Sequence, residues 1–271
     1  MPAEVRLIVG DCLRAMRRLD PGSVSVLVTS PPYNIAKPYA TYDDARPRSD
    51  YLRSMDRLGE AVRRILAPDG SFFVNLGGKP SDPWAAFEVA EQLRHHLVLQ
   101  NLIVWVKSLA VPPGELPDGD ARASEGIALG HYQPVNSPRF LNGLYEWVFH
   151  FTHRGDLPLD KLAIGVPYKD RTNVGRWRTA RSGLRDRGNV WFVPYPTIHS
   201  GRGHPSVFPT RLPELCLRLH GLSRIRLVLD PYLGTGATAV AARKLNLPFI
   251  GIDLDAGYVR QARARIAHRA H

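Results

Sequence analysis

The chain has 271 residues, enough for one large α/β domain with insertions, and its 36 Lys and Arg residues against 25 Asp and Glu give a formal charge of +11. This charge favours a polyanionic partner, with nucleic acid as the first candidate. Thirty of the 36 basic residues are Arg, a bias that suits phosphate and base-edge contacts, although a GC-rich genome would produce it without selection for binding. The sequence predicts a cytoplasmic protein with no membrane partner and no metal, because it lacks a bilayer-length apolar run, a signal-peptide pattern and any metal-ligand spacing of its cysteines and histidines.

Short strands alternate with helices along most of the chain. The stretch "SDYLRSMDRLGEAVRRILAPDG" carries apolar residues at spacings of three and four, begins at a Ser49-Asp50 cap and ends at Pro68-Asp69-Gly70, which predicts a helix. Other helices are expected at about 12–19 and 83–96, and strands at 5–9, 24–29, 71–77, 97–107, 145–152 and 189–194. This alternation predicts a Rossmann-like, doubly wound α/β fold with a mostly parallel sheet and helices on both faces.

Two segments in the middle of the chain interrupt this pattern. Residues 110–143 are rich in Pro, Gly and Asp without apolar periodicity, which predicts a loop or an inserted lobe. Residues 154–187 carry nine Lys or Arg against four acids, and loops of this length are usually functional or mobile. The expected organisation is therefore one half of the core at 1–109, a variable insert at 110–190 that contains the strand at 145–152, and the other half of the core at 191–271.

The strand at 24–29 runs directly into the tetrapeptide Ser30-Pro31-Pro32-Tyr33. Two prolines remove two backbone donors and fix two φ angles, so the turn is stiff. It presents a serine hydroxyl, backbone carbonyls that no helix takes up, and a flat aromatic ring with a polar tip. This stretch is interpreted as a preorganised set of hydrogen-bond acceptors beside an aromatic platform, with a proline-rich surface loop as the competing interpretation.

The segment 226–255 predicts a βαβ unit that binds a nucleotide. A buried strand at 227–229 ends in Asp230, a turn carries Gly234 and Gly236, a helix follows at about 237–245, and a second strand at 249–252 ends in Asp253. An acid in that last position can accept hydrogen bonds from both hydroxyls of a ribose. The glycine pattern also fits a nicotinamide dehydrogenase, but Asp230 would repel a pyrophosphate and suits the cationic S-adenosylmethionine better.

Taken together and in this order, "TSPPY" and "DPYLGTGAT" resemble the motifs of the β-class amino-DNA methyltransferases, with "GDC" at 10–12 and "HPSVFPTRLPELCLRLH" at 204–220 similar to two further family motifs. The resemblance implies the S-adenosylmethionine-dependent methyltransferase fold with an inserted basic target-recognition region, and double-stranded DNA as substrate. The implied catalytic residues are Ser30, Pro31, Pro32 and Tyr33, of which Ser30 and the Pro31 carbonyl would accept from the target amine and Tyr33 would stack on a flipped-out base. The implied cofactor-binding residues are Asp11, Cys12, Phe208, Asp230, Tyr232, Gly234, Gly236, Thr238 and Asp253, with His204 and Pro205 also shaping the pocket.

Several functions compete within and beyond this family. A serine at the first position of the tetrapeptide favours N4 of cytosine, with N6 of adenine as the close alternative and an RNA or protein amine as the next. A C5-cytosine enzyme is rejected because neither Cys12 nor Cys216 lies in a Pro-Cys loop. A nicotinamide-dependent oxidoreductase would leave Ser-Pro-Pro-Tyr unexplained, and a catalytically silent DNA-binding protein should have lost one of the two site motifs.

The basic segment supplies the candidate DNA contacts. They are Arg171, Arg176, Trp177, Arg178, Arg181 and Arg185, with phosphates or base edges as their targets. For any one of these arginines, a solvated basic surface is the competing interpretation. Members of the family that the chain resembles commonly dimerise, so the expected partners include a second copy of the chain. A cognate restriction endonuclease is a separate candidate partner.

Overall fold

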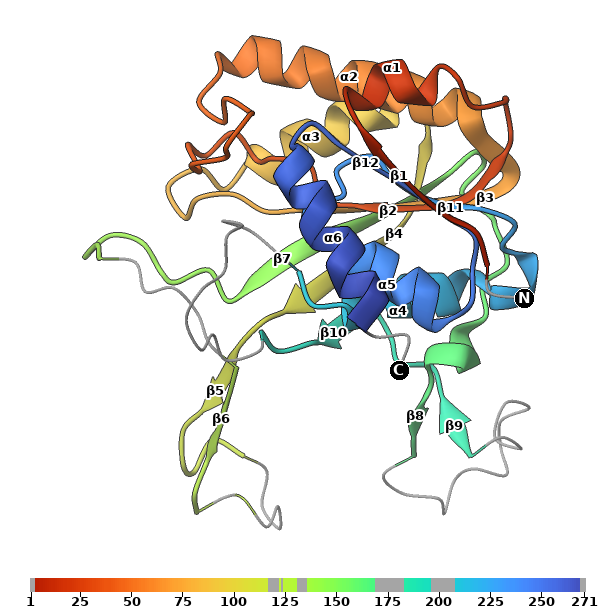
Figure 1. Ribbon diagram of the computed structural model, residues 1–271. Helices are drawn as coiled ribbons and strands as arrows, with labels where there is room; N and C mark the ends of the chain where they lie inside the picture. Colours follow the sequence, from red (N-terminus) through yellow and green to blue (C-terminus); the bar gives the residue numbers. More distant parts are fainter. Residues whose placement is uncertain are drawn as a thin grey trace.

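The computed structural model describes residues 3–116, 122, 124–130, 136–168, 183–195 and 208–268. Its centre is an eight-stranded sheet in the order β1-β12-β11-β2-β3-β7-β4-β10 (Figure 1). All neighbouring strands pair in parallel except β7, which is antiparallel to β3 and β4. The strands are β1 Val5–Val9, β2 Val24–Thr29, β3 Leu66–Leu76, β4 Val98–Val106, β7 Tyr145–Thr152, β10 Val190–Phe192, β11 Val228–Asp230 and β12 Phe249–Asp253.

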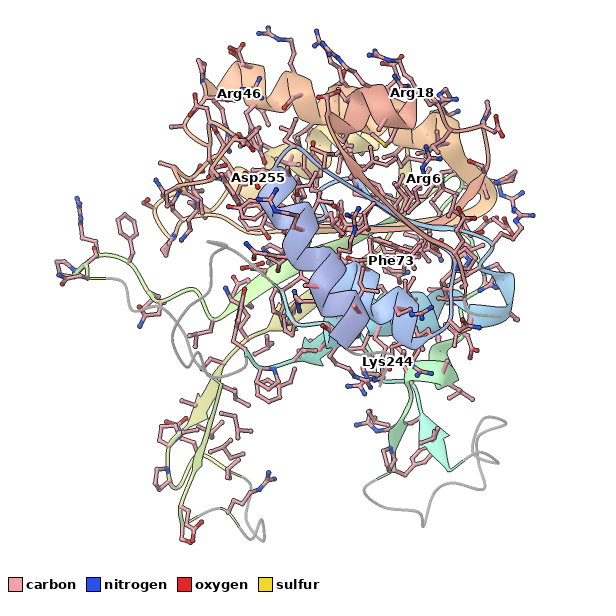
Figure 2. The ribbon with its side chains drawn as sticks, viewed as in Figure 1. Arg6, Arg18, Arg46, Phe73, Lys244 and Asp255 are labelled. Atoms are coloured by element: carbon pink, nitrogen blue, oxygen red, sulfur yellow. The ribbon has the colours of Figure 1, made fainter. Side chains whose placement is uncertain are left out.

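Helices cover both faces of the sheet, which confirms the doubly wound fold. Helices α1 Cys12–Met16, α2 Arg48–Ile65 and α3 Ala85–Arg94 pack on one face, and α4 Arg211–His220, α5 Ala237–Lys244 and α6 Ala256–His268 pack on the other (Figure 1). Alternate residues of β3 serve the two cores: Phe72 packs with α2 and α3, and Phe73 with α4 and α5. Figure 2 shows Phe73 at the centre of the molecule, with charged side chains such as Arg18 and Lys244 at its periphery.

Helix α2, strand β3 and helix α1 differ from the sequence prediction. Helix α2 begins at Arg48, with Pro47 at the N-cap and no side-chain cap, so the expected Ser49-Asp50 cap was wrong; Pro needs no N–H partner at a helix start. Strand β3 begins at Leu66 rather than Ser71, because Leu66 already pairs with Val24 before an irregularity in the register. Helix α1 ends at Met16, earlier than the predicted Leu19.

Two small hairpins extend from the main body, visible in the lower part of Figure 1. One joins β5 Leu109–Val111 to β6 Ile127–Leu129, so the segment expected as a loop or an inserted lobe contains a pair of antiparallel strands. The other joins β8 Val166–Pro167 to β9 Leu184–Arg185, just after a short 3-10 helix, η1, at Lys161–Ile164. A second 3-10 helix, η4 at Leu222–Arg224, precedes β11. The division into a 1–109 half, a 110–190 insert and a 191–271 half remains a prediction.

The sheet order brings the two sequence motifs together. Strand β2 pairs with β11, with Val26 opposite Val228 and Leu27 opposite Leu229, although about 200 residues separate them along the chain. Both strands are parallel, so the segments that follow them leave the same edge of the sheet. Ligands of open α/β sheets bind beyond that carboxyl edge.

Candidate functional site

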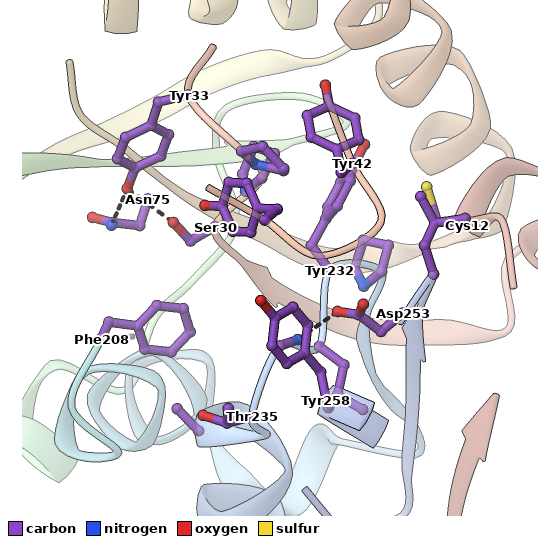
Figure 3. A pocket seen from close by; sticks show the side chains of 18 of the residues that line it. Cys12, Ser30, Tyr33, Tyr42, Asn75, Phe208, Tyr232, Thr235, Asp253 and Tyr258 are labelled. Atoms are coloured by element: carbon purple, nitrogen blue, oxygen red, sulfur yellow. Dashed lines mark hydrogen bonds between the residues drawn. The ribbon is translucent and has the colours of Figure 1, made fainter. Parts of the chain in front are cut away.

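A pocket lies at the carboxyl edge of the sheet. It is lined by the whole Ser30-to-Tyr33 turn, by Asp11 and Cys12 at the start of α1, by the loop from Pro231 to Thr235, and by Asp253 at the end of β12. In Figure 3, Ser30, Tyr33 and Asn75 lie together at one end of this pocket, and Cys12 and Asp253 lie at the other. The predicted catalytic motif and the predicted nucleotide motif therefore share one cavity.

The Tyr33 hydroxyl is the centre of a hydrogen-bond network at the catalytic end. It lies 2.8 Å from the Ser30 hydroxyl, donates to Glu146 Oε2 at 3.0 Å and accepts from Asn75 Nδ2 at 2.7 Å. Burial and the charge of Glu146 raise the pKa of Tyr33 well above its ordinary value, so this hydroxyl keeps its proton. The ring predicted as a stacking platform is thus held at its polar tip.

Glu146, Asn75 and Lys107 form the outer part of this network. Asn75 Nδ2 also donates to Glu146 Oε2 at 2.6 Å, and the Lys107 ammonium pairs with Glu146 Oε1 at 3.0 Å. The side chains of Lys107 and Glu146 are 17% and 15% exposed, so the pair is partly shielded from water. Sequence reasoning missed all three residues, although a single Asn inside "FFVNLG" and a Glu inside "YEWVF" are polar interruptions of apolar strands that could have indicated them.

The loop after Tyr33 is organised around one buried carboxylate. Asp44 is 3% exposed and accepts hydrogen bonds from the backbone N–H groups of Asn34, Ile35 and Lys37 at 2.8, 3.1 and 2.9 Å. Behind the turn, the Tyr51 hydroxyl of α2 donates to the Pro32 carbonyl at 2.9 Å. The turn is therefore held from the loop side and from the helix side, in addition to the stiffness of its two prolines.

At the cofactor end, Asp253 connects the two loops that bound the pocket. Its Oδ2 accepts from Gly234 N at 2.7 Å and its Oδ1 from Asp255 N at 2.9 Å, which leaves further lone pairs on both oxygens. Burial raises the pKa of Asp253, and the neighbouring Asp255 raises it further. Asp11 caps α1 by accepting from Arg14 N at 2.8 Å. The Cys12 thiol beside Tyr232 has its pKa raised to about 11 by burial, which makes it a poor nucleophile.

Asp230 and Thr238 lie behind the pocket wall rather than in it. Asp230 is 1% exposed, and its Oδ1 accepts from Thr29 Oγ1 at 2.6 Å and from Tyr232 N at 3.1 Å. The Thr238 hydroxyl reaches the Val28 carbonyl at 3.4 Å. Neither is among the side chains that line the cavity in the described part of the chain. Both residues therefore hold together the strands and the loop that bound the pocket. Their predicted contact with the cofactor stays a prediction.

The glycines of the loop serve different purposes. Gly234 lines the pocket with φ of 51° and offers its N–H to Asp253. Gly236 has φ of 82° at the start of α5, where a Cβ would come within 2.7 Å of the Ala262 Cβ. It permits α6 to pack closely against the start of α5.

Known proteins are similar to this chain in sequence and in fold. A family model described as DNA methylase, N6_N4_Mtase, matches residues 24–264. The chain belongs to this family. The match confirms the resemblance inferred from the sequence and the assignment of the chain as a DNA methylase.

Curated relatives of this DNA methylase are type II methyltransferases. M.BglII of Bacillus subtilis is 27% identical over 267 residues, which cover 92% of this chain and 65% of the relative. M.HpaI of Haemophilus parainfluenzae is 26% identical, covering 96% of this chain and 74% of the relative. The chain thus spans somewhat less than two thirds of the length of M.BglII.

Solved structures support the fold of the methylase. The PvuII DNA methyltransferase, described as cytosine-N4-specific, superposes with a TM-score of 0.69 at 18% identity and covers 98% of this chain and 87% of its own. TTHA0409 from Thermus thermophilus, complexed with S-adenosyl-L-methionine, has a TM-score of 0.61 at 21% identity, covering 97% and 93%. These similarities establish the methyltransferase fold.

Of the remaining predicted residues of the methylase, two lie within the described ranges and seven lie outside them. Phe208 lines the pocket. Arg185 is exposed on β9. Arg171, Arg176, Trp177, Arg178, Arg181, His204 and Pro205 lie outside the described residues. Aromatic side chains that sequence reasoning did not select also line the pocket: Tyr39, Tyr42, Trp105, Tyr195 and Tyr258.

Two features bear on metal and membrane binding. Within the described ranges, no three His, Cys, Asp or Glu side chains are grouped as metal ligands. In the same part of the chain, no helix is both long and apolar enough to cross a bilayer.

Proposed function

We propose that this DNA methylase transfers a methyl group from S-adenosylmethionine to the exocyclic amine of a base flipped out of double-stranded DNA, with N4 of cytosine as the favoured target. One observation carries the proposal. The catalytic turn at Ser30 follows strand β2, and the carboxylate of Asp253 ends strand β12 of the same sheet. Both line the same pocket, so a methyl acceptor and a nucleoside cofactor would meet there.

The cofactor end suits a nucleoside with a cationic side arm. Asp253 keeps lone pairs for ribose hydroxyls, and Asp11 could accept from the adenine amine. Aromatic walls such as Tyr232 and Phe208 can pack on the flat and apolar parts of the ligand. The carboxylates at this end would repel a pyrophosphate, which argues against a dinucleotide. S-adenosylmethionine, when bound, supplies an electrophilic methyl group.

The catalytic end suits an amine that must be activated without a covalent nucleophile. The lone pair of an aromatic amine is delocalised into its ring, so the reaction needs fixed acceptors that stabilise the charge the amine develops. Ser30 and the Pro31 carbonyl are proposed as those acceptors, on a turn held still by Tyr51 and Asp44. Tyr33 is proposed to stack on the base, which offsets part of the cost of unstacking it from the duplex.

Ser30 is the residue that favours cytosine as the proposed target base. Within the amino-methyltransferases that the sequence resembles, serine at this position is most often found with N4-cytosine enzymes, and aspartate or asparagine with N6-adenine enzymes. A neutral hydroxyl can accept from either amine, so N6 of adenine is the second candidate. Arg185 and the basic segment around it are proposed to contact the DNA, and a homodimer and a cognate restriction endonuclease are proposed as partners.

The test is methylation of mixed genomic DNA with labelled S-adenosylmethionine, followed by nuclease digestion and mass spectrometry of the nucleosides. We expect N4-methylcytosine in the reaction with the unmodified chain and none with Ser30→Ala. N6-methyladenine would assign the second candidate base. Failure to label either nucleoside, with calorimetry showing that the cofactor still binds, would contradict DNA as the substrate.

A further inference from the structure

The hydrogen-bond network at the catalytic end has a direction that its chemistry dictates. An ionised glutamate only accepts hydrogen bonds, and a lysine ammonium and an amide nitrogen only donate them. Lys107 Nζ and Asn75 Nδ2 point at the two oxygens of Glu146, at 3.0 and 2.6 Å, as expected for a carboxylate. The third partner of Glu146, the Tyr33 hydroxyl, therefore donates its proton to Oε2, at 3.0 Å.

The direction continues from Tyr33 to Ser30. The single proton of Tyr33 is committed to Glu146, and Asn75 Nδ2 already donates to the same Tyr33 oxygen at 2.7 Å. The 2.8 Å contact between the hydroxyls of Tyr33 and Ser30 can then form in only one way, with Ser30 donating. Once the Ser30 proton is directed to Tyr33, the lone pairs of the Ser30 oxygen remain for a partner in the pocket.

The orientation of Asn75 supports this interpretation. With its Nδ2 toward Tyr33 and Glu146, its Oδ1 is buried without a hydrogen-bond partner. A buried acceptor without a partner costs free energy, so the reverse orientation would be preferred unless a carboxylate held the amide nitrogen in place. In the reverse orientation Asn75 would accept from Tyr33 through Oδ1. Its two N–H donors would then occupy the buried position where Oδ1 now has no hydrogen-bond partner.

We infer that Glu146 is a positioning residue that sets the direction of the chain Glu146–Tyr33–Ser30, so that Ser30 presents acceptor lone pairs, and not its proton, to the target amine. The inference deepens the proposed function, on which it rests. It explains how a neutral serine can serve at a position where a carboxylate would accept without help: the negative charge is supplied two hydrogen bonds away, by antiparallel strand β7.

A kinetic test uses Glu146→Gln, alone and combined with Tyr33→Phe. In the Glu146→Gln variant the new amide oxygen should face Lys107, and no carboxylate then fixes the proton of Tyr33, so that Tyr33 can turn this proton toward Ser30. We expect kcat to fall at least about tenfold, with the dissociation constant of S-adenosylmethionine and the melting temperature nearly unchanged. Removing the Tyr33 hydroxyl disconnects Ser30 from Glu146, so Glu146→Gln should then change kcat less than about twofold.

Two outcomes of this cycle would overturn the inference. One is unchanged kcat in Glu146→Gln, and the other is an equal loss in the Tyr33→Phe background, which would indicate that Glu146 acts through another route. Neutron diffraction of the deuterated unmodified protein gives a readout that does not depend on activity. The Ser30 deuteron should lie on the line to the Tyr33 oxygen, and a Ser30 deuteron directed elsewhere would contradict the inference even if DNA methylation is confirmed. Absence of methylation by the unmodified chain would instead count against the proposed function.

Discussion

The Thr29 hydroxyl donates a 2.6 Å hydrogen bond to Asp230 Oδ1, across 201 positions of sequence. Thr29 is the last residue of β2 and directly precedes the catalytic turn, and Asp230 is the last residue of β11 and directly precedes the glycine loop. The same carboxylate oxygen accepts from Tyr232 N at 3.1 Å. One buried carboxylate thus joins the segment that would hold the methyl acceptor to the segment that would hold the cofactor.

Replacement of Asp230 by Asn should remove a pH dependence of stability. Burial raises the pKa of Asp230 from 3.8 to about 6. Because the folded state holds this proton more tightly than the unfolded state, the contribution to stability is fully present below about pH 4 and is lost as the pH rises through about 6. When the pH rises from about 4.5 to 7, the free energy of unfolding measured with urea should fall by about 2 kcal/mol more in the wild type than in Asp230→Asn.

Thr29→Val gives a second check on the same carboxylate. The Thr29 hydrogen bond is the largest of the interactions that lower the pKa of Asp230, so its removal should move the upper end of the pH window higher. Identical pH profiles of unfolding for wild type, Thr29→Val and Asp230→Asn would show that Asp230 is not the group responsible.

Two buried histidines should make the protein sensitive to acid. Ser71 Oγ lies 3.0 Å from His150 Nε2 and 2.9 Å from His220 Nδ1, and burial lowers the pKa of these histidines to about 3 and about 4. A lowered histidine pKa means that stability is present above about pH 6.5 and is lost as the pH falls toward the folded-state value. Glutamine at position 150 cannot titrate.

When the pH falls from about 7 to 5, the free energy of unfolding measured with denaturant should fall by about 2 kcal/mol more in the wild type than in His150→Gln. His153, which contacts the Leu66 carbonyl at 3.0 Å, offers a control site, since His153→Gln removes a histidine without touching Ser71. A similar reduction of acid sensitivity in both variants would count against the buried pair.

Asp253→Asn should weaken binding of S-adenosylmethionine. Both oxygens of the Asp253 carboxylate accept from backbone N–H groups, and an amide would turn an NH2 group toward one of them. The misfit of the Gly234 loop and the loss of a ribose acceptor should raise the dissociation constant about 10- to 100-fold in isothermal titration calorimetry.

Asp255→Ala is the matched control for that experiment. Asp255 lies two residues away and accepts from Tyr258 N at 2.9 Å near the start of α6, but it is not among the pocket-lining residues of the described chain. Its replacement should lower stability by about 1 kcal/mol and leave the affinity nearly unchanged. Equal losses of affinity in both variants would indicate a general effect on the α6 segment.

Asp44→Ala should unfold the loop that follows the catalytic turn. Three backbone donors would lose one charged acceptor, at a cost of about 3 kcal/mol in urea unfolding, and amide exchange of Ile35 and Lys37 should accelerate. Asp43→Ala is the control, because Asp43 is exposed and accepts a local hydrogen bond from Ala45 N; this change should alter stability by no more than about 0.5 kcal/mol. Slow exchange at Ile35 in Asp44→Ala would contradict the role given to this carboxylate.

Local chemistry is what the sequence by itself determined. Proline and glycine restrict or release backbone angles wherever they stand, so Ser30-Pro31-Pro32-Tyr33 and Gly234 to Gly236 were readable as a stiff turn and a close-approach loop. The alternation of apolar strands and amphipathic helices predicted the doubly wound sheet, and the order of the two motifs indicated the family.

Only the tertiary structure decided which distant residues complete the site. Strand β7 has an apolar pattern like that of the parallel strands, and its antiparallel insertion between β3 and β4 is what carries Glu146 to Asn75, Lys107 and Tyr33. Asp230 was predicted from the sequence as a cofactor ligand, but the pairing of β2 with β11 encloses it against Thr29. Strand pairing depends on contacts between segments that are far apart along the chain. A local pattern of residues therefore does not specify which other strand a given strand pairs with.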